Sequence, residues 1–126
     1  MIFIGLGFRK AVTIKSFENL IHQVYHLTEL PGPIKALATL DTKALDPALQ
    51  EFAAAKRITL IPVSLENLKR QITPTQSPAA QAAYGLGSIA EAAALSAAGD
   101  GSSLIFKRLV SSDKLTTCAF AKGSFK

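Results

Sequence analysis

Short apolar runs alternate with helix-forming segments along the first half of the chain. The runs have the length of buried strands and lie at residues 1–4, 34–41 and 58–64. A helical spacing of apolar residues follows each run, at residues 14–30, 44–56 and 65–71. Strands that alternate with helices usually pair in parallel, because each helix returns the chain along one face of the sheet. We therefore predict an α/β fold.

Capping residues mark where these helices begin. Asp46 is followed by Pro47, and an aspartate before a proline is a strong signal for a helix start. Thr13 and Ser64 precede the other two helices and can accept hydrogen bonds from their first N–H groups. Ser77 occupies the same position before a further short helix. The helix boundaries can therefore be predicted from local sequence.

The C-terminal part of the chain completes the fold. An alanine-rich helix at residues 89–98 precedes two apolar segments, at residues 102–110 and 114–122, whose pattern is typical of a β-hairpin. We expect a single three-layer domain over residues 1–126. It would hold a mixed, mainly parallel sheet of about five strands, with helices on both faces and a C-terminal β-hairpin. The sequence does not say which edge of the sheet the hairpin joins.

The charge of the chain indicates an anionic partner. With 126 residues it can build one hydrophobic core, and its formal net charge is +5. The basic residues stand singly or in pairs, and 7 Phe, 2 Tyr and no Trp offer little for stacking bases. We therefore expect a small polycarboxylate or phosphate ligand and no nucleic acid. The alternative, nucleic-acid binding through net charge, predicts a steeply salt-dependent affinity.

Cysteine and histidine usage suggests neither a disulfide nor a metal site. Cys118 is the one cysteine, so we interpret it as a packed thiol in a reducing compartment. His22 and His26 have the spacing of metal ligands on a helix but no third ligand, so we expect solvated histidines and no metal or cofactor. The N-terminus lacks the features of a signal peptide, and no apolar run is long enough to span a membrane. We expect a cytoplasmic protein.

The segment "GLGFRK" is the first candidate binding motif. Gly5 and Gly7 directly follow the first apolar run, and backbone N–H groups can gather around an anion at such a place. Arg9 and Lys10 would add positive charge beside it. The third glycine of a dinucleotide-binding fingerprint is missing. A tight turn without a ligand explains the glycines equally well.

A second candidate motif, "TLDTKALD", lies where the second strand ends. Asp41 would stand at the carboxyl end of that strand, where open α/β sheets bind their ligands. Thr39, Thr42 and Lys43 surround it. The alternative is that Asp41 and Thr42 only complete a turn. We favour a functional role, because the "GLGFRK" motif would lie on the same rim.

The third motif is "GLGSIAEAAALSAAG". Ser88 and Glu91 form a capping box, which explains both residues structurally, yet a helix N-terminus behind Gly87 is also suited to an anion. Ten of the 20 residues from 79 to 98 are alanine. So small a surface can lie flat on a broad planar ligand, or it can pack close to the sheet.

The order and spacing of these motifs resemble the CobE family, which is similar to the C-terminal domain of CbiG in cobalamin biosynthesis. "GLGFRK", "ALATLDTKALDPAL", "GLGSIAEAAAL" and "KR…TTCAFAK" carry the resemblance over essentially the whole chain. The resemblance implies a protein that binds or carries a precorrin intermediate. CbiG proteins instead open a lactone of a cobalt-precorrin and release acetaldehyde.

The resemblance also transfers site residues. The ligand-binding candidates are Gly5, Gly7, Arg9, Lys10, Thr39, Asp41, Lys43, Gly87, Ser88, Glu91 and Lys107. We expect binding or carriage of a precorrin, with other cobalamin-pathway enzymes as further partners. The alternative is a lactone-opening hydrolase or isomerase in which Asp41 or Glu91 is the general acid or base.

This chain departs from the family pattern at three places. Phe8 stands where the family commonly has cysteine, Ala11 stands where a glycine is expected, and the hairpin turn "SSDK" contains no glycine. The change at Phe8 removes any thiol at that position. It favours binding over catalysis.

Overall fold

Five strands form one sheet of order β3-β2-β1-β5-β4. The computed structural model describes residues 2–9, 12–27, 33–111 and 114–123. The strands are β1 (Ile2–Phe8), β2 (Ile34–Leu40), β3 (Thr59–Val63), β4 (Ser103–Val110) and β5 (Thr116–Lys122). β1, β2 and β3 are parallel, whereas β5 is antiparallel to both β1 and β4. The closing hairpin therefore joins the sheet beside β1.

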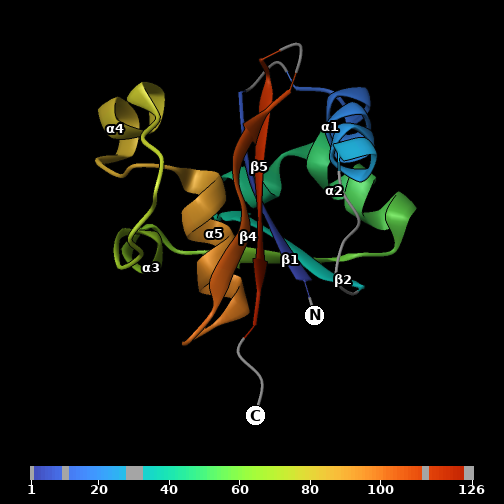
Figure 1. The fold of residues 1–126 in the computed structure, drawn as a ribbon. Coiled ribbons are helices and arrows are strands. Elements are labelled where there is room, and N and C mark those ends of the chain that lie inside the picture. Colours follow the sequence, from blue (N-terminus) through green and yellow to red (C-terminus); the bar gives the residue numbers. More distant parts are fainter. Residues whose placement is uncertain (1, 10–11, 28–32, 112–113, 124–126) are drawn as a thin grey trace.

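Helices cover both faces of this sheet (Figure 1). The helical segments are α1 (Ile14–Leu27), the 3-10 turn η1 (Lys43–Leu45), α2 (Pro47–Lys56), α3 (Leu65–Lys69), α4 (Pro78–Tyr84) and α5 (Ile89–Ala98). α1 and α2 lie on one face, and α3, α4 and α5 lie on the other (Figure 1). The predicted three-layer α/β fold with a mixed, mainly parallel sheet and a C-terminal hairpin is confirmed.

The helices begin at the predicted caps. The Asp46 carboxylate accepts hydrogen bonds from the N–H groups of Ala48 and Leu49 at 2.9 and 3.4 Å. Ser64 and Ser77 cap α3 and α4 in the same way. Each side chain satisfies a backbone donor that has no partner within the helix, which is why the boundaries follow local sequence.

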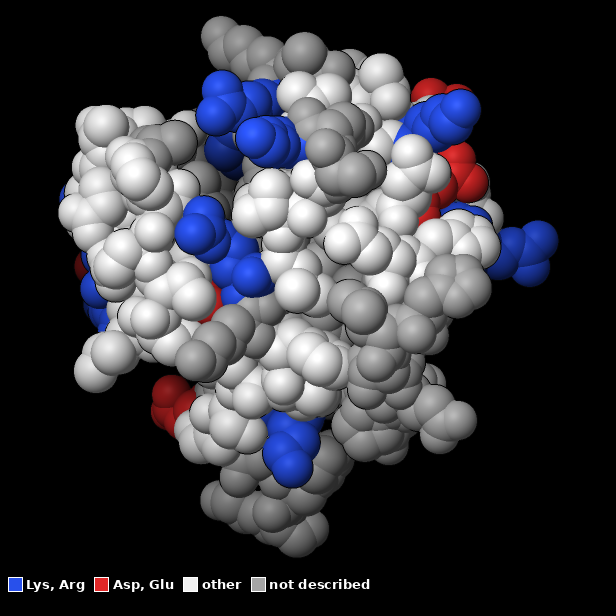
Figure 2. All heavy atoms as spheres, turned by 45° about the horizontal axis from the view of Figure 1, so that its top comes forward, with Lys and Arg blue, Asp and Glu red and all other residues white. Residues whose placement is uncertain are grey.

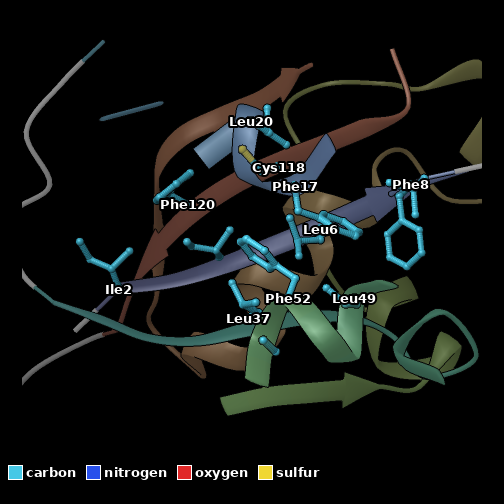
Figure 3. Packing of buried hydrophobic residues seen from close by; sticks show 13 residues of the cluster. Ile2, Leu6, Phe8, Phe17, Leu20, Leu37, Leu49, Phe52, Cys118 and Phe120 are labelled. Atoms are coloured by element: carbon cyan, nitrogen blue, oxygen red, sulfur yellow. The ribbon is translucent and has the colours of Figure 1, made fainter. Parts of the chain in front are cut away.

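The larger core lies between the sheet and helices α1 and α2 (Figure 3). Alternate residues of β1 face it, so that Leu6 packs with Phe17 and Phe52. The rings of Phe17 and Phe52 lie 5.5 Å apart, and Phe8 meets Phe17 edge to face at 5.3 Å. The even-numbered residues of β1 therefore point toward α1 and α2, and the odd-numbered ones face α5.

The expected turn at Gly5–Gly7 is wrong, because both glycines lie inside β1, the central strand. A Cβ on Gly5 would lie 1.8 Å from the carbonyl oxygen of Ala90 and 2.5 Å from the nitrogen of Ala94. The backbone of α5 thus sits directly on the strand. Ala92 and Ala93 of this helix are fully buried. The alanine-rich helix packs close to the sheet, and its buried face offers no surface to a planar ligand.

Cys118 lies in β5 with its side chain in the core. Burial raises the pKa of its thiol from 9.0 to about 12. No helix within the described ranges is both long and apolar enough to cross a membrane.

This shift predicts a pH dependence of stability. The folded-state pKa lies above the unfolded one, so the protonated thiol contributes fully below pH 9 and its contribution is lost as the pH rises toward 12. We expect the free energy of unfolding to fall by about 1.4 kcal/mol per pH unit above pH 9 relative to Cys118→Ala. Urea titrations of both proteins between pH 7 and 10.5 measure this difference. Parallel pH profiles would contradict it.

Candidate ligand pocket

A cavity of about 880 Å³ opens at the carboxyl end of β1, between α4 and the β4–β5 hairpin. It is lined by Gly7, Phe8, Arg9, Lys43, Ser77, Pro78, Ala80, Ala83, Tyr84, Ser88, Ile89, Arg108, Val110, Lys114, Leu115 and Thr117. β1 pairs in parallel with β2 on one side and antiparallel with β5 on the other, so the two parts of the sheet meet at this strand. Crevices at such points of an open sheet are the usual ligand sites of α/β folds.

The charge around this cavity is positive. Arg9, Lys43, Arg108 and Lys114 line it, and none of the described lining residues is acidic. Figure 2 shows Lys and Arg side chains gathered around a hollow in this face of the molecule. Cations that line a hollow without an opposing carboxylate favour an anionic ligand.

The rest of the lining is mostly apolar. Phe8 and Ile89 contribute from β1 and from the start of α5. Ala80, Ala83 and Tyr84 contribute from α4. The small side chains of α4, rather than those of α5, therefore leave room beside the sheet. The cavity combines an apolar wall with cations, a composition suited to an apolar molecule that carries acidic groups.

Lys43 is held in place at the cavity wall. Its Nζ donates a hydrogen bond of 2.6 Å to the carbonyl oxygen of Phe8 and lies 4.9 Å from the centre of the Phe8 ring. Arg9 differs, because its backbone N–H bonds to the Leu115 carbonyl at 3.0 Å while its side chain is exposed. The Lys43 ammonium is therefore fixed by the fold, whereas the Arg9 side chain is exposed to solvent.

The other residues predicted at the end of β2 lie away from the cavity lining. Asp41 is exposed, and its Oδ1 accepts a hydrogen bond from the Thr42 N–H at 2.8 Å, as the turn interpretation expects. Thr39 is fully buried and donates to the Leu6 carbonyl at 2.7 Å. Of this motif, only Lys43 reaches the cavity, because the cavity opens beside β1 and the hairpin rather than beside β2.

The capping box at the start of α5 is formed only in part. Ser88 Oγ accepts from the Glu91 N–H at 3.2 Å. Glu91 is 0% exposed, and its Oε1 accepts from the Thr75 N–H and hydroxyl at 3.0 and 2.8 Å. Its Oε2 accepts from the Arg108 N–H at 2.9 Å. The carboxylate thus bonds to two other segments of the chain, and Ser88 alone caps the helix.

Of the remaining predicted residues, some are at close packing contacts and others lie outside the part of the chain that the structure describes. Gly5 lies under α5, and a Cβ on Gly87 would come within 2.4 Å of the Thr73 hydroxyl. Lys10 lies outside the described residues, as do the side chains of Lys107 and His26. Four predicted residues line the cavity, namely Gly7, Arg9, Lys43 and Ser88.

Arg108 and Lys114 were not among the residues predicted from the sequence. Strand alternation counted from Phe106, which packs in the core with Phe120, would place Arg108 on the α1 face. The pairing of β4 with β5 is irregular between Phe106 and Leu109, and Arg108 lies on the α5 side instead. The basic pair at 107–108 was a usable signal, but the irregularity hid that Arg108 lines the cavity.

Comparisons with known proteins agree on one family. A family model described as cobalamin synthesis G C-terminus matches residues 2–121. A sequence comparison with curated proteins finds no match. The solved structure of CobE, a protein from the cobalamin (vitamin B12) biosynthetic pathway, is similar with a TM-score of 0.87 at 23% identity, over 100% of this chain and 92% of that one.

Two further solved structures are similar over almost the whole chain. The cobalamin biosynthesis protein chiG from Agrobacterium tumefaciens has a TM-score of 0.75 and 28% identity, over 99% of this chain and 100% of that one. A protein described as a cobalamin biosynthesis protein G homolog from Sulfolobus solfataricus has a TM-score of 0.71 and 23% identity, over 98% of this chain and 37% of that one. The fold, the motifs and the matched family model together place the chain in the cobalamin biosynthesis family that comprises CobE and the C-terminal domain of CbiG.

Proposed function

We propose that this protein binds a precorrin intermediate of cobalamin biosynthesis in the cavity between α4 and the β4–β5 hairpin. The observation that carries the proposal is the set of four cations that line this cavity of about 880 Å³, namely Arg9, Lys43, Arg108 and Lys114. None of the described residues in its lining is acidic. A precorrin is a broad, partly apolar ring that carries carboxylates. Charge-assisted hydrogen bonds to those carboxylates and contact of the ring with the apolar wall would hold it.

The positions of the two candidate carboxylates favour binding over catalysis. Glu91 is fully buried and both of its oxygens already accept hydrogen bonds from the protein. Asp41 does not line the cavity. A general acid or base must come within hydrogen-bond reach of the reacting group. A hydrolase or isomerase that uses either residue would need a different arrangement of this region.

A carrier role also implies partners. A protein that binds an intermediate without converting it must receive it from one enzyme of the pathway and deliver it to another. We propose these pathway enzymes as its protein partners.

An absorbance titration with hydrogenobyrinic acid, followed over time, tests the proposal. A saturable spectral shift that stays constant is the result expected of a carrier. A shift followed by a new chromophore would support the enzyme instead. No shift would contradict binding of a corrin-type ligand.

The exposed cations should tune the affinity. We expect Arg9→Gln and Lys114→Gln each to weaken binding of hydrogenobyrinic acid about twofold to fivefold, because exposed ion pairs contribute up to about 1 kcal/mol. The loss should shrink at high salt, where exposed charges are screened.

Lys56→Gln is the matched control for this comparison. Lys56 is an exposed cation at the end of α2 and does not line the cavity. An equal loss in all three variants would mean that net charge, and not this cavity, attracts the ligand.

A further inference from the structure

The buried carboxylate of Glu91 connects the two walls of the cavity. Its Oε1 accepts from Thr75, which stands two residues before Ser77, the cap of the α4 wall. Its Oε2 accepts from the N–H of Arg108 in the β4 wall at 2.9 Å. One side chain of α5 therefore bonds both to the segment that leads into α4 and to the strand opposite it.

The side chain of Arg108 completes a ring of contacts. Its Nη2 donates to the carbonyl oxygen of Gln76 at 3.4 Å, and Gln76 follows Thr75 directly in the chain. The ring runs from Glu91 to Thr75 and Gln76, then through the guanidinium of Arg108 back to Glu91. Arg108, which lines the cavity, is thus fixed both through its backbone N–H and through the bond of its guanidinium to the segment that leads into α4.

One donor in this ring is left without a protein partner. The Nε of Arg108 is buried and makes no hydrogen bond to any described residue. Buried donors of this kind normally have an acceptor. A guanidinium can bind a carboxylate through two neighbouring N–H groups at once, and a lysine ammonium cannot reproduce that geometry.

We propose that Arg108 binds a carboxylate of the ligand and that Glu91 is the positioning residue that fixes Arg108 and the base of α4 for this contact. The inference rests on the proposed function for the identity of the ligand. Glu91 does not touch the ligand and acts on it through Arg108, which the ring of contacts holds in place.

Hydrogen–deuterium exchange of the ligand-free protein tests the positioning role. Thr75→Val removes the hydroxyl that bonds to Glu91 and keeps the size of the side chain, whereas Thr75→Ser keeps the hydroxyl. We expect Thr75→Val and Glu91→Gln to speed exchange at residues 75–88 and at Arg108 about tenfold, with β1 and β2 unchanged and Thr75→Ser like the wild type. A uniform change over the whole domain, or none, would overturn the positioning role.

Binding of hydrogenobyrinic acid tests the carboxylate contact. Arg108→Lys keeps the charge but loses the planar geometry, and we expect it to bind about tenfold more weakly. Glu91→Gln removes a buried negative charge next to Arg108, so charge alone predicts tighter binding of an anion, whereas loss of positioning predicts weaker binding. Weaker binding supports the proposal, and equal or tighter binding contradicts it.

A double variant separates positioning from general destabilisation. Thr75→Val should weaken binding about threefold in the wild-type background and have no further effect in Arg108→Lys, because it acts through Arg108. Asp46→Ala, which removes the α2 cap on the other face of the sheet, is the control for lost stability and should leave affinity unchanged. Additive effects of Thr75→Val and Arg108→Lys would overturn the proposal.

The proposed function and this inference can be contradicted by different results. If the wild type does not bind hydrogenobyrinic acid, the proposed function and the carboxylate role of Arg108 both fall, and the exchange data alone decide the role of Glu91. If the wild type binds hydrogenobyrinic acid and Arg108→Lys and Glu91→Gln bind it equally well, the proposed function stands and this inference is wrong.

Discussion

Gly5→Ala is expected to unfold the domain or to lower its melting temperature by about 10–20 °C. The added methyl would lie 1.8 Å from the Ala90 carbonyl oxygen and 2.5 Å from the Ala94 nitrogen, and both are backbone atoms of α5. A helix backbone cannot move aside without pulling its buried neighbours away from the sheet. Overpacking of this kind costs about 3 kcal/mol or more out of a total stability of roughly 5–15 kcal/mol. Thermal and urea unfolding followed by circular dichroism measure the loss.

Gly7→Ala is the matched control on the same strand. Gly7 also faces α5, but the atom nearest to its added Cβ is the Thr117 hydroxyl at 2.8 Å, the end of a side chain that can rotate. We expect a loss of about 1 kcal/mol, mainly from the Thr117 hydrogen bond to the Gly7 carbonyl. Equal stability of Gly5→Ala and the wild type would mean that α5 does not lie on β1 as closely as the structure has it.

Ala83→Trp is expected to weaken binding of hydrogenobyrinic acid more than a hundredfold, which corresponds to about 3 kcal/mol. Ala83 is exposed on α4 and lines the cavity, so an indole at this position would occupy space that the proposed ligand needs. Because the side chain is not part of a core, we expect the melting temperature to stay within a few degrees of the wild type. The absorbance titration and a thermal scan measure the two effects separately.

Ala82→Trp provides the comparison for this variant. Ala82 is an exposed neighbour on the same helix but does not line the cavity. Its replacement should leave the affinity almost unchanged. If both tryptophan variants bind like the wild type, the ligand binds elsewhere, and if both lose binding, the effect comes from α4 as a whole.

Most of the fold was determined by sequence signals that act over a few residues. Asp46, Ser64 and Ser77 cap their helices as expected, because a side chain reaches N–H groups two or three positions further along the chain. The apolar runs became strands and the closing segments became a hairpin for a similarly local reason. The alternation of strands and helices then restricted the architecture to a layered α/β sheet.

The site depended on contacts between distant segments, which local patterns do not specify. The glycines of "GLGFRK" were expected to form a turn, yet Gly5 lies in β1 and allows the backbone of α5 to reach that strand. A turn and a close approach of a helix can both use the same local sequence. Glu91 was expected to complete a capping box or to act as an acid or base, yet its oxygens bond to Thr75 and Arg108, 16 and 17 residues away. The sequence by itself determined the helices, the strands and the positive charge. Only the tertiary structure decided which cations share one cavity, because that depends on the place of the hairpin beside β1 and on the irregular pairing of β4.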